Sequence, residues 1–122
     1  MSYIEIDPEI IYFTHSRIRE KFSGCNKTLY ETLEEIKSNK ISVHDLPKIT
    51  VYYDKINNTY FSQNNRRLWI FKYCKQNGLL DNKRSNQKSL DFGKIIVRIQ
   101  LLPTNKKYSK ETCSLNAKIC LK

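Results

Sequence analysis

The sequence predicts a single small domain of the α/β class with two main helices. Its length of 122 residues suits one domain with one modest hydrophobic core. Two segments without helix breakers have helical character, at 29–38 and 66–77. Runs of β-branched and aromatic residues at 49–53 and 95–102 are typical of strands, so helices and strands alternate along the chain.

The N-terminal part supplies one strand and the first helix. Weak alternation around Pro8 predicts a short strand over 10–13. Thr28 followed by Glu31 has the form of a capping box, in which each side chain bonds the backbone N–H of the other residue. Apolar residues recur at helical spacing behind this pair, which predicts an amphipathic helix over 29–38.

A hairpin and a second helix follow. The strand at 49–53 leads to an Asn-Asn turn signal at 57–58, and residues 60–62 return antiparallel. The next helix spans 66–77 and should end at Gly78, because glycine readily adopts the left-handed conformation after a helix.

The last predicted strand is IIVRIQLL at 95–102, which Pro103 stops. The predicted order is therefore strand, helix, strand, strand, helix, strand. We expect one domain over 1–102 and a lysine-rich tail over 103–122, and leave short structure at 113–121 open.

The net charge of +10 is unevenly distributed. Residues 1–60 contain eight Lys/Arg and nine Asp/Glu, a net charge of −1, whereas residues 61–122 contain 14 and three, a net charge of +11. A basic half favours a polyanionic partner such as a nucleotide or nucleic acid. A lysine- and asparagine-rich composition with plainly solvated charges is the alternative.

We expect an intracellular protein, cytoplasmic or nuclear, without a membrane segment or a metal site. No apolar run approaches the roughly 18–20 residues that cross a bilayer. The beginning, MSYIEIDPEI, lacks the basic region of a secretory signal. The four cysteines, at 25, 74, 113 and 120, show no metal-binding spacing, and thiols are favoured over disulfides.

Residues 60–74, YFSQNNRRLWIFKYC, place two arginines where a strand ends and a helix begins. The N-terminus of a helix already carries partial positive charge and unpaired N–H groups. Arg66 and Arg67 oppose this dipole unless an anion lies beside them, so the pattern predicts an anion site.

The segment PKITVYY at 47–53, its hairpin and YFSQNNRRLWIFK together resemble the ParB/sulfiredoxin-like superfamily. In ParB proteins the helix begins with G-E-R-R-x-R-A and in sulfiredoxins with F-G-G-C-H-R-Y, and NNRRL occupies this place here. NKTLYETLEEI is similar to the helix that precedes the strand in that superfamily. The resemblance covers about residues 10–100 and implies a small mixed sheet with a hairpin and two main helices.

The resemblance implies that the loop binds the phosphates of a nucleotide. ParB domains bind CTP, sulfiredoxins use ATP, and some archaeal relatives phosphorylate free serine. Asn64 and Asn65 would then offer backbone and amide donors, while Arg66 and Arg67 would pair with phosphate oxygens. The choice between ATP and CTP stays open, and Mg²⁺ would come with the nucleotide.

The R-x-R of HSRIREKF loosely matches an N-terminal segment of the superfamily, which implies that Arg17 and Arg19 face the same pocket. Asn64 replaces the signature glycine, and asparagine tolerates the positive φ that we expect there. Asn65 replaces both the ParB glutamate and the sulfiredoxin cysteine, so sulfinic-acid reduction is not expected. Cys25 precedes the first helix and is not expected to be that nucleophile.

Three function classes stay open: a nucleotide or nucleic-acid binding module, a small phosphotransferase or nucleotide hydrolase, and a protein-interaction domain with a vestigial pocket. Glu20 is the candidate general base for catalysis. Candidate contacts to a nucleic-acid backbone lie in a basic loop and in the tail: Lys83, Arg84, Lys88, Lys106, Lys107 and Lys110.

Overall fold

The structure is a computed structural model that describes residues 2–15, 17–19, 27–79, 93–103, 108–109 and 113–120. It is a small mixed α/β fold, as predicted. None of the helices in these ranges combines the length and the apolar character needed to cross a membrane.

The elements in chain order are β1 (Ser2–Ile6), the 3₁₀ turn η1 (Pro8–Ile10), β2 (Ile11–Tyr12), β3 (Arg17–Arg19), α1 (Leu29–Lys37), the 3₁₀ turn η2 (Val43–Asp45), β4 (Thr50–Asp54), β5 (Thr59–Ser62), α2 (Asn65–Gln76), β6 (Ile95–Leu101) and β7 (Lys118–Cys120).

Five strands form one mixed sheet in the order β1-β6-β4-β5-β2. β6 pairs antiparallel with β1 and parallel with β4, and β5 pairs antiparallel with β4 and parallel with β2. The predicted hairpin is therefore the β4–β5 pair, and the predicted last strand lies in the sheet between β1 and β4.

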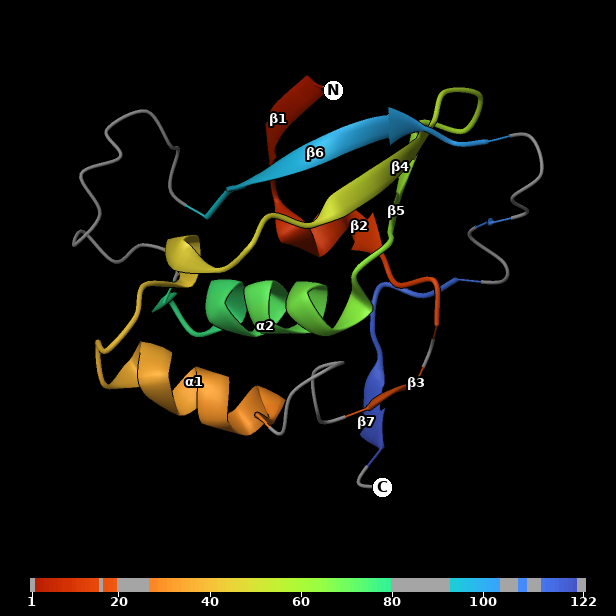
Figure 1. The fold of residues 1–122 in the computed structure, drawn as a ribbon. Coiled ribbons are helices and arrows are strands. Elements are labelled where there is room, and N and C mark those ends of the chain that lie inside the picture. Colours follow the sequence, from red (N-terminus) through yellow and green to blue (C-terminus); the bar gives the residue numbers. More distant parts are fainter. Residues whose placement is uncertain are drawn as a thin grey trace.

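Both helices lie on the same side of the sheet, and α2 lies between the sheet and α1 (Figure 1). The core forms where α2 packs on the strands, and Leu68, Ile70, Val51 and Val97 are fully buried there. α1 adds its apolar stripe from the other side of α2, where Leu29, Leu33 and Ile36 are buried. Burying one such side chain stabilises the fold by about 1.5–3 kcal/mol.

The predicted helix ends are confirmed. Thr28 and Glu31 form the capping box: the Glu31 N–H donates to the Thr28 hydroxyl over 3.0 Å and the Thr28 N–H to the Glu31 carboxylate over 3.1 Å. Gly78 has a φ of +73°, as expected for the residue after the C-cap of α2. Asn58 also has a positive φ, of +51°, in the predicted hairpin turn.

Three strands were not predicted. β1 is an edge strand paired with β6, and β3 pairs parallel with β7. β7 lies within 113–121, where short structure was left open. A second contact binds the tail to the domain, because Phe13 and Ser114 exchange backbone hydrogen bonds of 2.6 and 3.2 Å.

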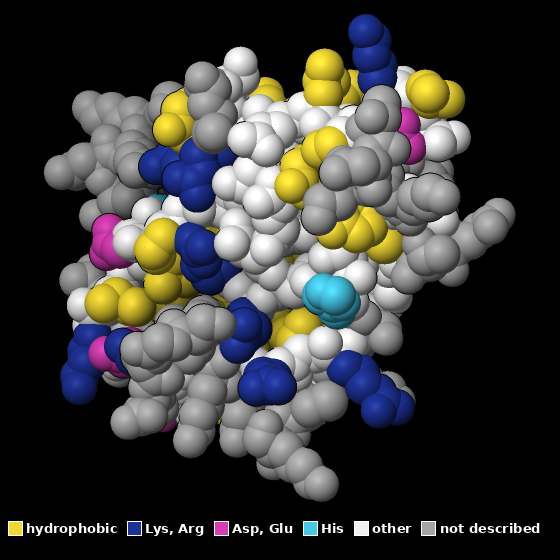
Figure 2. All heavy atoms as spheres, turned by 45° about the vertical axis from the view of Figure 1, so that its right-hand side comes forward, with side chains coloured by type: hydrophobic (Ala, Val, Ile, Leu, Met, Phe, Trp, Pro, Cys, Tyr) yellow, Lys and Arg dark blue, Asp and Glu magenta, His cyan; other side chains and the backbone are white. Residues whose placement is uncertain are grey.

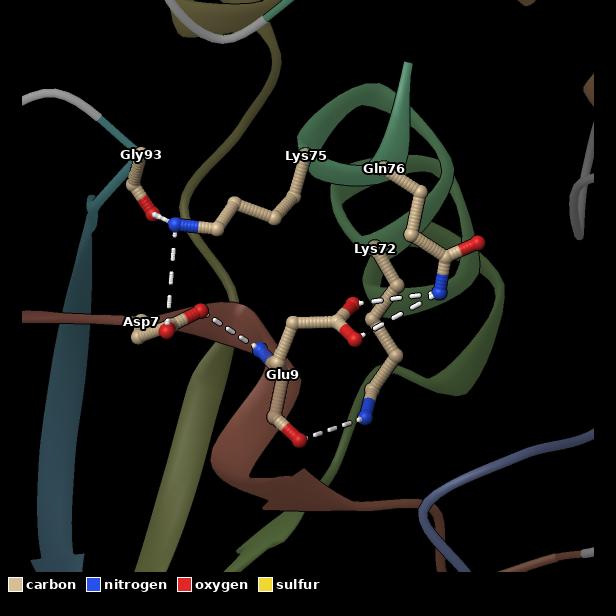
Figure 3. A network of polar contacts seen from close by, with 6 residues as sticks. All are labelled: Asp7, Glu9, Lys72, Lys75, Gln76 and Gly93. Carbon is tan, nitrogen blue, oxygen red and sulfur yellow. Dashed lines mark hydrogen bonds and ion pairs between the residues drawn. The ribbon is translucent and has the colours of Figure 1, made fainter. Parts of the chain in front are cut away.

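A polar network joins one face of α2 to the N-terminal segment (Figure 3). Lys75 pairs with Asp7 at 3.8 Å and donates to the Gly93 carbonyl over 3.2 Å. One turn earlier, the buried Lys72 donates to the Glu9 carbonyl over 3.3 Å and to the Leu115 carbonyl over 2.8 Å. These contacts hold η1 and the tail against α2.

Candidate anion-binding site

A cavity of about 890 Å³ lies at the start of α2. Its volume falls within the range of roughly 300–1,000 Å³ that is common for ligand sites. All six residues predicted to bind phosphate line it, although two of them lie about 45 positions before the rest. They are Arg17, Arg19, Asn64, Asn65, Arg66 and Arg67.

β3 brings the first pair of arginines to the cavity. Successive side chains of a strand point to opposite faces. Ile18 is buried, whereas Arg17 and Arg19 on either side of it are exposed. The strand thus places two guanidinium groups on one face, as the R-x-R pattern requires.

Asn64 is the N-cap of α2, but its side chain does not cap the helix. The Asn64 Oδ1 accepts the Thr50 N–H at 2.8 Å, and the Asn64 N–H donates to the Ser62 hydroxyl over 2.9 Å. The first hydrogen bond within the helix joins the Leu68 N–H to the Asn64 carbonyl at 3.0 Å. The side chain of Asn64 therefore anchors the start of the helix to β4.

The expected positive φ at Asn64 is wrong. Its φ is −127° with a ψ of +73°. A residue with a side chain adopts this φ without the steric cost of the left-handed region. The turn into α2 therefore does not need the glycine of the ParB and sulfiredoxin signatures.

The side chain of Asn65 holds the segment between β2 and β3 at the start of α2. The Asn65 Oδ1 accepts the Thr14 N–H at 3.1 Å, and the Asn65 Nδ2 donates to the Thr14 hydroxyl over 2.9 Å. The Thr14 hydroxyl in turn donates to the Ser62 carbonyl over 3.1 Å. The amide oxygens of Asn64 and Asn65 and the Asn65 Nδ2 donor are thus engaged in the frame of the site, and the backbone N–H groups of the first turn are the better candidates for binding an anion.

We predict that Asn65→Ala lowers the free energy of unfolding by about 1–3 kcal/mol, because it leaves the partly buried Thr14 N–H without its acceptor and removes the donor to the Thr14 hydroxyl. Urea denaturation measures this change. Asn77→Ala removes a more exposed hydrogen bond at the other end of α2 and should cost about 0.5 kcal/mol or less. Equal losses for the two variants would contradict the positioning role of Asn65.

Arg67 reaches across the entrance to α2. Its guanidinium donates to the Lys48 carbonyl over 3.1 Å, and the same carbonyl accepts from Arg98 at 2.9 Å. Burial lowers the pKa of Arg67, and the neighbouring charge of Arg98 lowers it further. Within the part of the chain that the structure describes, Arg67 forms no ion pair with a carboxylate. An anion beside Arg67 would offset this repulsion.

The described lining of the cavity is strongly basic. Lys27 pairs with Glu35 of α1, and none of the described lining residues is Asp or Glu. A cavity lined by charges of one sign attracts ions of the opposite sign. The cationic side chains are Arg17, Arg19, Lys27, Arg66 and Arg67, and His15 lies among them.

Sequence reasoning missed the aromatic side of the cavity. Tyr52 of β4 and Tyr108 of the tail line it, together with Gln63. Tyr108 stands in the segment KKYSK, where an aromatic residue among lysines was the available signal. Nothing local indicated that this segment returns to β4.

Several predicted residues lie outside the described residues: Cys25, the candidate base Glu20, the loop residues Lys83, Arg84 and Lys88, and the tail residues Lys106, Lys107 and Lys110. Their roles stay predictions. In the described ranges, no group of three or more His, Cys, Asp or Glu side chains is placed to hold a metal ion.

Comparisons with models of known protein families, with curated proteins and with solved structures gave no match for this chain.

Proposed function

We propose that this protein binds nucleotide phosphates in the cavity at the start of α2. One observation carries the proposal: β3 and the first turn of α2, distant in sequence, bring four arginines to the same cavity. Arginine suits phosphate because its planar guanidinium donates two parallel hydrogen bonds to two oxygens.

The backbone at this end of α2 supports the same ligand. The side chain of Asn64 is bound to β4 instead of capping the helix. N–H groups before the first bond of a helix, together with its dipole, favour an anion over water. Phosphate oxygens would accept hydrogen bonds from these groups while the arginines neutralise the charge.

We also propose that the domain is a divergent member of the ParB/sulfiredoxin-like superfamily. Two features support this assignment: the β4–β5 hairpin leads directly into α2, and NNRR starts that helix. A ParB-like domain would bind CTP or ATP, with Mg²⁺ on the phosphates. A binding role fits the lining better than catalysis does, because the described lining contains no carboxylate and the one candidate base, Glu20, is outside the described residues.

Nucleic acid is the second candidate ligand. Figure 2 shows Lys and Arg side chains running across the middle of the face it draws, with the acidic side chains toward its edges. A basic surface of this kind suits the repeating phosphates of a nucleic-acid strand.

Equilibrium titration of the wild-type protein with CTP, ATP and a short single-stranded oligonucleotide tests the proposal. We expect saturable binding of at least one triphosphate, competed by inorganic tripolyphosphate, with only moderate salt dependence. Tighter binding of the oligonucleotide with a steep salt slope would favour the nucleic-acid ligand instead, because each neutralised phosphate releases counterions. Release of phosphate from ATP or CTP would identify the enzymatic alternative. No binding of any probe at millimolar concentration would refute the proposed function.

A further inference from the structure

We propose that Tyr52 and Tyr108 form a stacking platform for the planar ring of the ligand whose phosphates lie at α2. The inference rests on the proposed function and adds the residues that contact the ring of the nucleotide. A bare polyphosphate or a sugar phosphate has no aromatic ring and would not use this platform.

Tyr52 lies on the face of the sheet that the helices leave uncovered. Val51 belongs to the core beneath the helices, so the next residue of the strand points to the opposite face. Tyr52 pairs there with Phe61 of β5, and Phe61 pairs with Tyr12 of β2. An aromatic row thus crosses three neighbouring strands.

Tyr108 covers this row. The centre of its ring lies 5.7 Å from the centre of the Phe61 ring and 6.1 Å from that of the Tyr52 ring, at interplanar angles of 40° and 34° respectively. Phe61 is fully buried, whereas Tyr52 and Tyr108 stay partly exposed and line the cavity. The contact between the two tyrosine rings and that of Tyr108 with Phe61 restrict both side chains, so little side-chain freedom would be lost when a ligand stacks on them.

The cavity joins this platform to the arginines. Gln63, which directly precedes the N-cap of α2, also lines the cavity, and its amide donates to Gln100 over 3.3 Å. Tyr52 and Gln100 are register partners in β4 and β6. The lining therefore contains an aromatic pair, an amide and the cationic first turn of α2. These groups match the ring, the polar middle part and the phosphates of a nucleotide.

A second aromatic pair in the same hairpin has no such access. The rings of Tyr53 and Tyr60 stack with their centres 5.0 Å apart and an interplanar angle of 30°. The Tyr53 hydroxyl donates a hydrogen bond to the Asn58 side chain. Neither residue lines the cavity. Tyr53 is therefore a matched control: it adjoins Tyr52 in β4 but points to the other face.

Isothermal titration with CTP, ATP and tripolyphosphate tests the platform, because tripolyphosphate keeps the charge and lacks the ring. We expect Tyr52→Leu and Tyr108→Leu each to lower the affinity for CTP or ATP, whichever the wild type binds more tightly, by about five- to a hundredfold. This range is typical of one base–aromatic stack. Tripolyphosphate binding should change less than twofold. Tyr52→Phe should retain nucleotide binding because it keeps the ring, and Tyr53→Leu should bind all three probes like the wild type.

The outcomes separate this inference from the proposed function. If the wild type binds tripolyphosphate as tightly as the nucleotides, or if the leucine variants of Tyr52 and Tyr108 weaken both kinds of ligand equally, the platform is refuted while the phosphate site stands. If the wild type binds none of the probes, both are refuted. Circular dichroism and urea denaturation of each variant show that a loss of affinity is not a loss of folding.

Discussion

Replacing Arg66 and Arg67 together with alanine should weaken the binding of CTP or ATP by about a hundredfold or more. Each charge-assisted hydrogen bond to a phosphate oxygen contributes roughly 1.5–3 kcal/mol, so two lost partners account for two or more decades of affinity. Isothermal titration at constant ionic strength measures the change. Unlike the platform variants, this double variant should also lose tripolyphosphate binding, because it removes the groups that contact phosphate.

Two comparison variants separate a phosphate contact from a change in net charge. Lysine at positions 66 and 67 keeps the charge but not the planar fork, so it should restore binding only in part. A Lys40→Ala/Lys55→Ala variant also removes two positive charges, from exposed positions that do not line the cavity. It should bind nucleotides within about threefold of the wild type, because these exposed charges do not contact the ligand and salt screens them.

A folded Arg66→Ala/Arg67→Ala variant that binds nucleotides and oligonucleotides as well as the wild type would rule out the phosphate site. Arg67 would then serve only to bind the Lys48 carbonyl beside Arg98. Binding this carbonyl alone gives little stabilisation to two guanidinium groups. Their like charges repel, and the carbonyl oxygen offsets this repulsion only in part.

Features that depend on neighbouring residues were predictable from the sequence. The capping box at Thr28, the glycine after α2 and the β4–β5 hairpin lie close to their predicted positions, since each signal acts over a few residues. The gathering of the arginines was expected only through the resemblance. The structure adds the physical reason: a three-residue strand turns Arg17 and Arg19 to the side on which α2 begins.

Features that depend on distant pairing were not predictable. β3 reads as a polar stretch, and it is a strand because β7, about 100 residues later, supplies its hydrogen-bonding partner. Tyr108 reaches the cavity only because the chain after β6 returns over β5. The hydrogen bonds of the Asn65 amide were not predictable for the same reason, since their partner Thr14 lies 51 positions away. No local periodicity encodes such contacts.

Lys72 should give the protein a pH-dependent stability that a neutral side chain abolishes. Its side chain is buried in α2, and its ammonium lies 5.2 Å from the centre of the Phe13 ring. The carbonyls of Glu9 and Leu115 accept its hydrogen bonds (Figure 3 draws the first). Burial lowers the pKa of Lys72 from 10.5 to about 8, although the charges of Glu9 and Asp7 act in the opposite direction.

The sign of the effect follows from proton binding. Between pH 8 and 10.5 the unfolded chain holds a proton on Lys72 that the folded chain has released, so stability rises with pH in this window. Below pH 8 both states are protonated and the fold bears the full cost of the buried charge. One pKa unit corresponds to about 1.36 kcal/mol, so the gain from pH 7 to pH 10 is roughly 2–3 kcal/mol.

We predict that the free energy of unfolding of the wild type, minus that of Lys72→Met, rises by roughly 2–3 kcal/mol between pH 7 and pH 10. Urea denaturation at several pH values measures this difference. Burial raises the pKa of the Cys74 thiol to about 12, which lowers stability above pH 9 in both proteins and cancels in the subtraction. Methionine suits the comparison because it is an unbranched apolar side chain without a charge. A difference that does not vary with pH would show that the two carbonyls keep the ammonium charged throughout.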